Sequence, residues 1–275
     1  MTRRSLLIAV LGLLAAPAGG VQAQFDHEHA AWTALLKKHV VLLDGGKASR
    51  VDYAGFAGDR TALNAYRESL SKVTAQEFGR WDKARQLAFL INAYNAATVE
   101  KVLTRYPDIK SIWDFGRLFG NPFKDRFIRL FDRNVSLDNI EHDTIRAEGA
   151  YEDPRIHFAV NCAAITCPML REEAYVEARL DSQLEEQTIR FLSDRSRNRY
   201  NPATGTLEVA KLFDSYPWYG GDFRRGWMGL HSLEQFFAKY AAVLADHPEQ
   251  QQQIRDRKAE VRFLDYDWGL NSVGR

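Results

Sequence analysis

The first half of the chain repeats its apolar positions at the helical period. Ala30 to Leu43 is spaced as an amphipathic helix, and Leu63 to Val73 as a second, shorter one. A long helix is predicted next, with Thr74 as its N-cap, Glu77 completing a capping box, and a core from Leu87 to Leu103. Because this core is apolar on nearly every side, we predict that the helix is buried.

Two amides interrupt the apolar surface of that helix. Asn92 and Asn95 lie three residues apart, share a side of the helix, and would both be buried. One interpretation is a structural polar network in which each amide is satisfied. The other interpretation places both among the substrate-binding residues, with the Asn92 side chain at an oxyanion site.

The second half of the chain mixes strand and helix patterns. Strands are predicted over residues 123–130, 155–161, 206–212 and 260–267, and helices over 137–147, 168–192 and 233–244, the first of these capped by Ser136. The pattern predicts an α+β fold, in which a mainly antiparallel sheet packs on helices around the central buried helix.

The N-terminus has the pattern of an export signal. Arg3 and Arg4 precede an apolar run from Ser5 to Ala16, which is too short to span a bilayer, and Val21-Gln22-Ala23 fits a cleavage site. A twin-arginine signal and a general secretory signal both fit this segment. We therefore expect residues 1–23 to be a signal peptide and residues 24–275 to be a single periplasmic or secreted domain with an N-terminal helical extension. No later apolar run is long enough for a transmembrane anchor.

The charge balance argues against nucleic acid as a partner. The chain holds 37 Lys and Arg against 36 Asp and Glu, a formal net charge of +1, and the arginines are dispersed rather than clustered. The two cysteines lack the histidine spacing of a zinc motif, so no metal or other cofactor is expected.

Candidate chemistry concentrates between Arg155 and Pro168, which holds both cysteines. The pattern predicts a strand that runs into a helix at Cys167-Pro168, and a helix N-terminus stabilises a thiolate. Cys162 is thus a candidate nucleophile and Cys167 a second thiol. The alternative is a disulfide between them that closes a small loop, as an oxidising compartment favours.

The pattern leaves open which histidine and which carboxylate would act with Cys162. In a regular strand His157 and Asn161 face one side and Cys162 the other, so His157 approaches Cys162 only if the strand ends or bulges. On the predicted helix 137–147, Glu141 falls on the apolar face and His142 at its margin. A buried carboxylate needs a partner, so Glu141 is expected to contact Arg155, a histidine or backbone amides.

Aromatic side chains gather in two places near the C-terminus. Tyr216, Trp218, Tyr219 and Phe223 occupy a Pro/Gly-rich loop, and Trp268 follows the last predicted strand. Such a loop is typical of a ligand wall and equally of a lid over the core.

Several ordered segments resemble one family, the domain of unknown function 547 (DUF547). They are Phe89-Leu90-Ile91-Asn92-Ala93-Tyr94-Asn95-Ala96, Ser136-Leu137-Asp138-Asn139-Ile140-Glu141-His142, Asp153 to Cys162, Cys167-Pro168, Lys211-Leu212-Phe213, and Tyr266 to Asn271. The resemblance implies a fold similar to the papain- and transglutaminase-like thiol hydrolases.

Together these features predict a periplasmic thiol-dependent hydrolase or acyl transferase acting on amide or peptide bonds. Cys162 would be the nucleophile, His157 or His142 the base, and Glu141 the orienting carboxylate. The candidate substrate-binding residues are Asn92, Asn95, Arg155, Asn161 and Trp218, and the expected ligand is a peptide, glycan or small amide. The alternative is a non-catalytic envelope binding module with a structural disulfide.

Overall fold

The computed structural model describes residues 24–116, 120–214, 222 and 225–274. The predicted signal peptide at residues 1–23 and the candidate Trp218 lie outside these residues. No helix in the described ranges combines the length and the apolar character that crossing a membrane requires.

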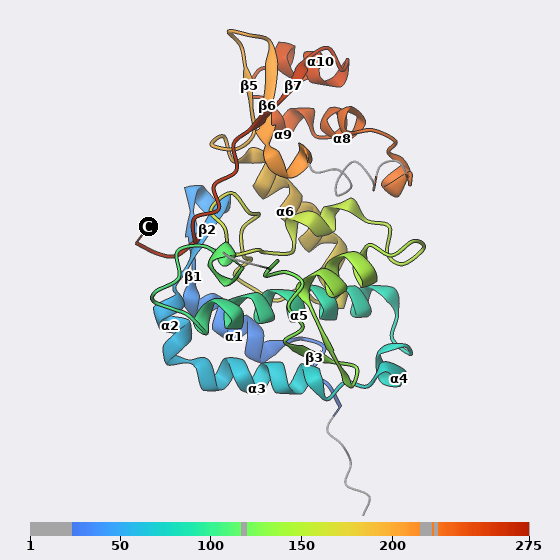
Figure 1. Ribbon diagram of the computed structural model, residues 1–275. Helices are drawn as coiled ribbons and strands as arrows, with labels where there is room; N and C mark the ends of the chain where they lie inside the picture. Colours follow the sequence, from blue (N-terminus) through green and yellow to red (C-terminus); the bar gives the residue numbers. More distant parts are fainter. Residues whose placement is uncertain (1–23, 117–119, 215–221, 223–224, 275) are drawn as a thin grey trace, which may run out of the picture.

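The long buried helix is the centre of the fold, as predicted. Helix α5 spans Lys83–Leu103, and every residue from Gln86 to Leu103 is buried. It crosses the middle of the molecule in Figure 1. The helix begins at Asp82, whose carboxylate accepts a hydrogen bond from the Arg85 amide. Thr74 caps a separate short helix, α4 (Ala75–Phe78), by accepting the Glu77 N–H, so the predicted N-cap begins a different helix from the one expected.

The N-terminal helices pack beside α5. They are α1 (Ala30–His39), α2 (Tyr53–Gly58) and α3 (Arg60–Ser71). The prediction that the first helix reaches Leu43 is wrong, because the apolar run after His39 forms strand β1 (Val40–Leu43) and pairs antiparallel with β2 (Ala48–Val51). Gly45 and Gly46 adopt positive φ in the connecting turn, which favours this hairpin over a longer helix.

The strands of the described residues form three small sheets rather than one. Strand β3 (Ile128–Leu130) pairs with β4 (Arg133–Val135), and a third sheet has the order β5-β6-β7, formed by Arg199–Asn201, Thr206–Ala210 and Glu260–Leu264. Three pairings are antiparallel, and the β6–β7 pairing is parallel. The α+β class is therefore confirmed, whereas the single main sheet is not, because short hairpins separated by helices do not join.

The apolar side chains form two clusters. The larger surrounds α5, and the smaller lies between β6 and the helices α6 (Leu180–Ser193), α8 (Leu233–Lys239), α9 (Ala241–Leu244) and α10 (Pro248–Arg255). The predicted helix 233–244 is thus broken at Tyr240. Ile156 belongs to the first cluster and Phe158 to the second, so the segment that carries His157 runs between the two cores.

That segment departs most from the prediction. The strand expected over residues 155–161 is wrong, because Pro154–Phe158 form a 3-10 helix, η4, with Pro154 in its first turn and Asp153 as its cap. The helix expected from Pro168 is also wrong, since α6 begins only at Leu180, after the short 3-10 turn η5 (Glu177–Arg179).

Residues 168–176 are not helical, and side chains from α5 and α6 form hydrogen bonds with their backbone. Gln187 donates to the Met169 carbonyl, Gln183 binds backbone groups of Ala174 and Val176, and Asn92 binds those of Tyr175. These contacts satisfy backbone groups that a helix would otherwise have paired.

Candidate functional site

A cavity of about 340 Å³ lies where α5 meets the segment that carries the cysteines. It is lined by the predicted chemical groups Cys162, Cys167, His157, His142 and Glu141, together with Tyr94, Trp113, Asn121, Phe123, Asp138, Val160, Pro168, Lys211, Leu212, Tyr266 and Trp268. All four residues predicted to be catalytic therefore meet at one cavity. Asn92, Asn95, Arg155 and Asn161 are not among its lining residues.

His157 and Cys162 face the same cavity because the backbone between them is not a strand. The 3-10 helix ends at Phe158, and the chain then turns at Ala163, whose φ of 64° lies in the left-handed region. A regular strand would have placed His157 and Cys162 on opposite faces. Because the strand is absent, both side chains line the same cavity and can act together.

Asn161 organises the loop that carries both cysteines. Its amide nitrogen donates to the Pro168 carbonyl at 2.7 Å, and its side-chain oxygen accepts the Ala163 N–H at 3.1 Å. Its own backbone N–H donates to the side-chain oxygen of Asn95 at 2.9 Å. The contacts of Asn161 therefore fix the backbone that presents Cys162 to the cavity.

Both asparagines of α5 bind backbone groups. Asn95 also donates to the Ala159 carbonyl at 2.9 Å, and Asn92 makes two hydrogen bonds with the backbone of Tyr175. Each side chain thus uses its donor and its acceptor to hold an irregular segment. These contacts favour the structural interpretation over an oxyanion role for Asn92.

The two cysteines are free thiols in different environments. Cys162 is half-buried, and its Sγ lies 3.2 Å from the Tyr266 hydroxyl oxygen. Cys167 is buried, and its Sγ accepts the backbone N–H of Cys162 at 2.8 Å. The pair is therefore joined by hydrogen bonds rather than by a disulfide.

These environments shift the two thiol pKa values in opposite directions. Burial raises the pKa of Cys162, but hydrogen bonds from Cys167, Tyr266 and the Ala164 amide outweigh it, so the pKa falls below its ordinary value. Burial raises the pKa of Cys167, and its bond to Cys162 raises it further. Cys162 is therefore the thiol that ionises more readily, and local donors rather than a helix N-terminus are the cause.

His157 lies between two carboxylates. Its Nε2 is 2.6 Å from an oxygen of Asp222, and its Nδ1 is 3.7 Å from an oxygen of Glu141. Asp222 is fully buried and also accepts from the guanidinium of Arg146 at 2.9 Å. Burial raises the pKa of Asp222, but His157 and Arg146 together hold it below the ordinary value. An ionised Asp222 fixes the orientation of the His157 ring and places a proton on Nε2.

Glu141 is buried against a histidine, as predicted. Burial raises its pKa above the ordinary value, although His157, Arg146 and a hydrogen bond with Tyr94 oppose the rise. Arg155, the other partner considered, binds instead to Asp153, Asp181 and Glu185, away from the cavity lining.

His142 is a weaker candidate for the base than His157. Its Nδ1 lies 2.8 Å from an Arg146 guanidinium nitrogen, so the basic lone pair of this ring nitrogen is engaged. Burial, followed by the positive charge of Arg146, lowers the pKa of His142 to about 3. A base with that pKa holds a proton too weakly to accept one from a thiol near neutral pH.

Glu141, His142 and Arg146 come from one unusually wide turn. Ser136 caps the start of the segment by accepting the Asn139 N–H, as predicted, but residues Asn139–Ile145 form a π-helix, η3. The Arg146 amide donates to the Glu141 carbonyl, five residues back. Such turns are frequent at functional sites.

Sequence reasoning missed Asp222, Tyr266 and Arg146 as members of this site. Tyr266 lies in one of the segments that resemble the DUF547 family, which is the one signal that pointed to it. Asp222 follows two glycines in a predicted loop, and a single carboxylate there carries no periodicity or spacing that marks it.

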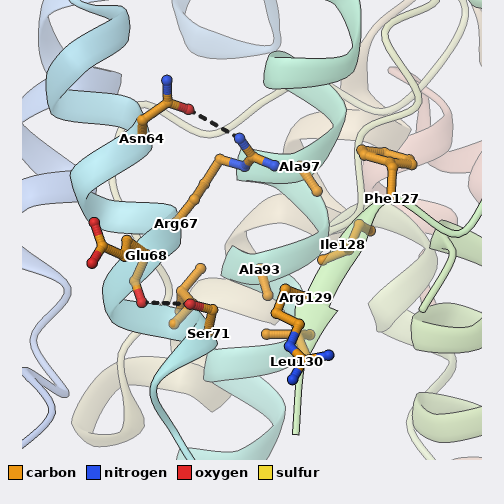
Figure 2. Close-up of a pocket in the computed structure, with 11 residues that line it drawn as sticks. Asn64, Arg67, Glu68, Ser71, Ala93, Ala97, Phe127, Ile128, Arg129 and Leu130 are labelled. Carbon is orange, nitrogen blue, oxygen red and sulfur yellow. Dashed lines mark hydrogen bonds between the residues drawn. The ribbon is translucent and has the colours of Figure 1, made fainter. Parts of the chain in front are cut away.

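A second cavity, of about 240 Å³, lies between α3, α5 and β3 (Figure 2). Its lining includes Arg67, Glu68 and Arg129 around an apolar floor but neither a cysteine nor a histidine. Within the described ranges, no group of three or more His, Cys, Asp or Glu side chains is arranged to hold a metal ion. The cavity at Cys162 is therefore the candidate site.

A family model matches the part of the chain that carries both cysteines, His157, His142 and Glu141. No curated protein and no solved structure matches the chain, so the papain-like fold stays a prediction. The family model described as "Protein of unknown function, DUF547" matches residues 78–192, a range that includes α5, the π-helix, both cysteines and α6 up to Leu192. The match over this region supports the resemblance to the DUF547 family that the ordered segments predicted.

Proposed function

We propose that this protein is a thiol-dependent hydrolase or acyl transferase that acts on amide or peptide bonds, with Cys162 as its nucleophile. The proposal rests mainly on the residues that share one cavity. A half-exposed thiol with a lowered pKa shares it with a histidine whose ring is oriented by the buried Asp222. A nucleophile, a base and a group that orients the base are the parts that covalent acyl transfer needs.

The reaction assigns each group one role. His157, with its Nε2 proton held by Asp222, takes the thiol proton at Nδ1 as Cys162 attacks the substrate carbonyl. The leaving amine receives that proton from His157, and an acyl-thioester remains on Cys162. Water, or the amine or hydroxyl of an acceptor, then attacks the thioester and regenerates the thiol. Hydrolysis and acyl transfer thus differ only in this second nucleophile.

Two further groups support the charges that develop. The Tyr266 hydroxyl, 3.2 Å from the sulfur, is a donor beside the position of the carbonyl oxygen and takes the oxyanion role that the sequence suggested for Asn92. Glu141, 3.7 Å from Nδ1 of His157, stabilises the imidazolium while that ring carries the extra proton.

We also propose that this chemistry takes place outside the cytoplasm. The N-terminal basic and apolar pattern with its Val21-Gln22-Ala23 segment supports export to the periplasm or beyond. A peptide, a glycan-linked amide or a small amide is the corresponding substrate class.

The direct test is acylation of the purified protein by p-nitrophenyl acetate. We expect a burst of p-nitrophenolate and an acetyl group that peptide mapping locates on Cys162. The Cys162→Ala variant should lose both, whereas Cys167→Ala should keep a measurable burst. If the wild-type protein is not acylated and its Cys162 reacts with iodoacetamide no faster than a model thiol, the nucleophile is wrong. The cavity would then act as a binding site without catalysis.

A further inference from the structure

An aromatic wall leads away from the Cys162 thiol along the cavity. Tyr266, which contacts the sulfur, has its ring centroid 4.4 Å from that of Trp268. Trp268 in turn lies 5.4 Å from Trp113 and 6.5 Å from Phe123, again between ring centroids. All four rings line the cavity. The mechanism proposed above uses only Tyr266, so three rings have no role in it.

A carboxylate stands at the far end of this wall. The backbone N–H of Asp138 donates to the Phe123 carbonyl at 2.9 Å, which places Asp138 beside the last ring, and Asp138 lines the same cavity. Its side chain is 19% exposed. It is therefore sheltered from bulk water yet reachable from the cavity.

The positive groups near Asp138 neutralise it weakly. The Nε2 atom of His142 is 4.0 Å away, but the low pKa of that ring leaves it uncharged near neutral pH. Lys124 contributes a favourable charge from an exposed position, and Asp143 adds a repulsive one. A half-buried carboxylate in this setting attracts a cation that enters the cavity.

We propose that Asp138 and the rings of Phe123, Trp113 and Trp268 form a subsite for a cationic group, so that the preferred substrate carries an ammonium or guanidinium next to the bond that Cys162 attacks. The carboxylate supplies charge, and the faces of the rings supply cation–π attraction and cover for an alkyl stem. The inference deepens the proposed function, and its reactive step rests on that function, whereas the binding step does not.

Lys211 is the one lining residue of this cavity in the described chain whose charge opposes the proposal. It lies at the start of the 3-10 turn η6 (Lys211–Asp214), and its side chain is exposed. The contacts that link Cys162 to Asp138 run through the aromatic wall and do not include Lys211. Neutralising Lys211 therefore serves as a control for neutralising Asp138, because both changes remove one charge at the same cavity.

A binding titration tests the subsite without a reactive thiol. Tryptophan fluorescence of the full protein is followed while Nα-acetyl-lysine amide or its uncharged analogue Nα-acetyl-norleucine amide is added. We expect saturable binding of the lysine compound, at least about tenfold tighter than the norleucine compound. Asp138→Asn should remove that preference, and Lys211→Gln should keep it. Equal affinity for the two compounds, or a preference that survives in Asp138→Asn, would overturn the inference.

A kinetic measurement then separates this inference from the proposed function. Cys162 is modified with methanethiosulfonates that carry an ammonium, a sulfonate or no charge, and each rate is divided by that of a small free thiol. We expect the ammonium reagent to react about tenfold faster than the neutral reagent, and Asp138→Asn to abolish the difference. If the neutral reagent fails to modify Cys162, the proposed function fails while the titration still decides the subsite. If the neutral reagent reacts well but the ammonium reagent has no advantage, the subsite fails alone.

Discussion

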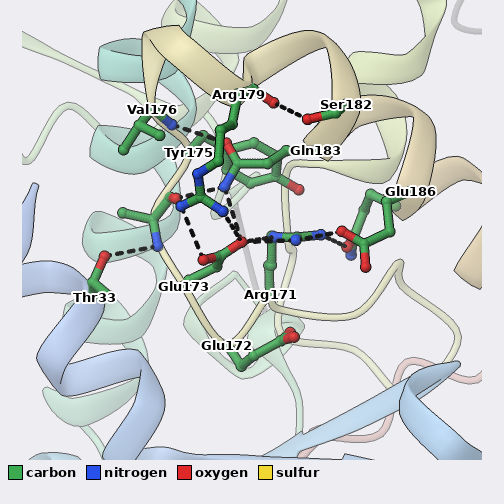
Figure 3. Close-up of polar contacts among 12 residues, drawn as sticks. Thr33, Arg171, Glu172, Glu173, Tyr175, Val176, Arg179, Ser182, Gln183 and Glu186 are labelled. Carbon is green, nitrogen blue, oxygen red and sulfur yellow. Dashed lines mark hydrogen bonds and ion pairs between the residues drawn. The ribbon is translucent and has the colours of Figure 1, made fainter. Parts of the chain in front are cut away.

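Two clusters of charged side chains in this molecule differ in how burial and neighbouring charges shift the pKa values of their members. The cavity cluster consists of Glu141, His142, Arg146, His157 and Asp222. The arginine cluster consists of Arg171, Glu172, Glu173, Arg179 and Glu186, which Figure 3 labels, together with Arg190. Each cluster contains at least one arginine that forms an ion pair with a carboxylate. Three members of the first cluster, Glu141, His142 and His157, line the cavity that holds Cys162, and no member of the second cluster does.

In the arginine cluster, opposite charges dominate. Burial alone would raise the pKa of Glu173, but hydrogen bonds from Arg179, Arg171 and Gln183 outweigh it and lower the pKa to about 2. Burial likewise opposes the charge of Arg171, yet its carboxylate partners raise its pKa. Each group thus keeps its charge, and together they hold the irregular segment 171–176 against α6.

In the cavity cluster, burial dominates for two of the five groups. It raises the pKa of Glu141 and lowers that of His142 to about 3, so both are pushed toward their neutral forms. A fold gains no stability from such an arrangement, and perturbed groups beside a cavity are typical of functional sites. The comparison is consistent with a structural role for the arginine cluster and with the chemistry proposed for the cavity cluster.

The largest effect should separate the clusters by reactivity. His157→Ala removes the base, so the rate of acylation by p-nitrophenyl acetate should fall about 10³-fold. Arg171→Met, in the other cluster, should leave that rate within about twofold, because Arg171 is not among the residues that line the cavity. Stopped-flow measurement of the burst gives both numbers. A His157→Ala protein that is acylated at the normal rate would show that the cavity cluster holds no base.

The second effect should separate the clusters by stability. Arg171→Met leaves Glu173 and Glu186 without a shared cation, and we expect a loss of about 2 kcal/mol in the free energy of unfolding, since Glu186 is partly exposed. Urea denaturation measures it. Glu186→Gln is the control and should cost less than about 1 kcal/mol. If Arg171→Met unfolds at the wild-type urea concentration, the arginine cluster does not support the fold.

The sequence predicted the regular parts of this fold well. The buried helix α5, the helix α3 and the strands β6 and β7 follow from local apolar periodicity, which neighbouring segments do not override. The prediction failed over residues 154–179, where buried asparagines and glutamines from α5 and α6 bind the backbone directly. The contacts of Asn95 and Asn92 join residues 64 and 83 positions apart in the chain, and contacts at such separations leave no local pattern.

The four catalytic candidates of the site could be predicted from the sequence, but their pairing and the residues around them could not. Cys162 and His157 follow from the segment that holds both residue types, and Glu141 and His142 follow from their places on and beside the apolar face of the predicted helix 137–147. Strand alternation separated His157 from Cys162, since nothing in the pattern distinguishes a buried 3-10 helix from a short strand. Asp222 was missed because its role depends wholly on a contact 65 positions away in the chain.

A third effect should appear in the acid range, where the clusters lose stability in different windows. His142 has a folded pKa of about 3 against an ordinary 6.5, so between these values the unfolded state binds a proton that the folded state does not, and the free energy of unfolding falls as the pH falls from 6.5 toward 3. Glu173 has a folded pKa of about 2 against an ordinary 4.5, so its contribution is lost only as the pH falls from 4.5 toward 2.

Urea denaturation across this range should resolve the two windows. His142→Gln should flatten the slope between pH 6.5 and 4.5 by up to about 1 kcal/mol per pH unit, and Glu173→Gln should flatten it only below 4.5. Some slope should remain in the first window, because burial also lowers the pKa of His29 to about 4. If Glu173→Gln changed the upper window and His142→Gln did not, the two clusters would be assigned the wrong way round.

The smallest effect should be a shift in the pH midpoint of Cys162 alkylation rather than a loss of reactivity. It tests why the thiol pKa of Cys162 lies below that of Cys167. The hydrogen bond with Cys167 is the largest influence that lowers the pKa of Cys162 against burial. In Cys167→Ala that donor is gone, so the midpoint of the rate of alkylation by iodoacetamide against pH should move to higher pH. The rate on the alkaline plateau should not fall, because a more basic thiolate is intrinsically more nucleophilic. Cys167→Ser keeps a hydroxyl donor at this position and should restore much of the wild-type midpoint, while Arg171→Met should leave it unmoved. A midpoint that is the same in Cys167→Ala and in the wild type would mean that Tyr266 and the Ala164 amide alone stabilise the thiolate.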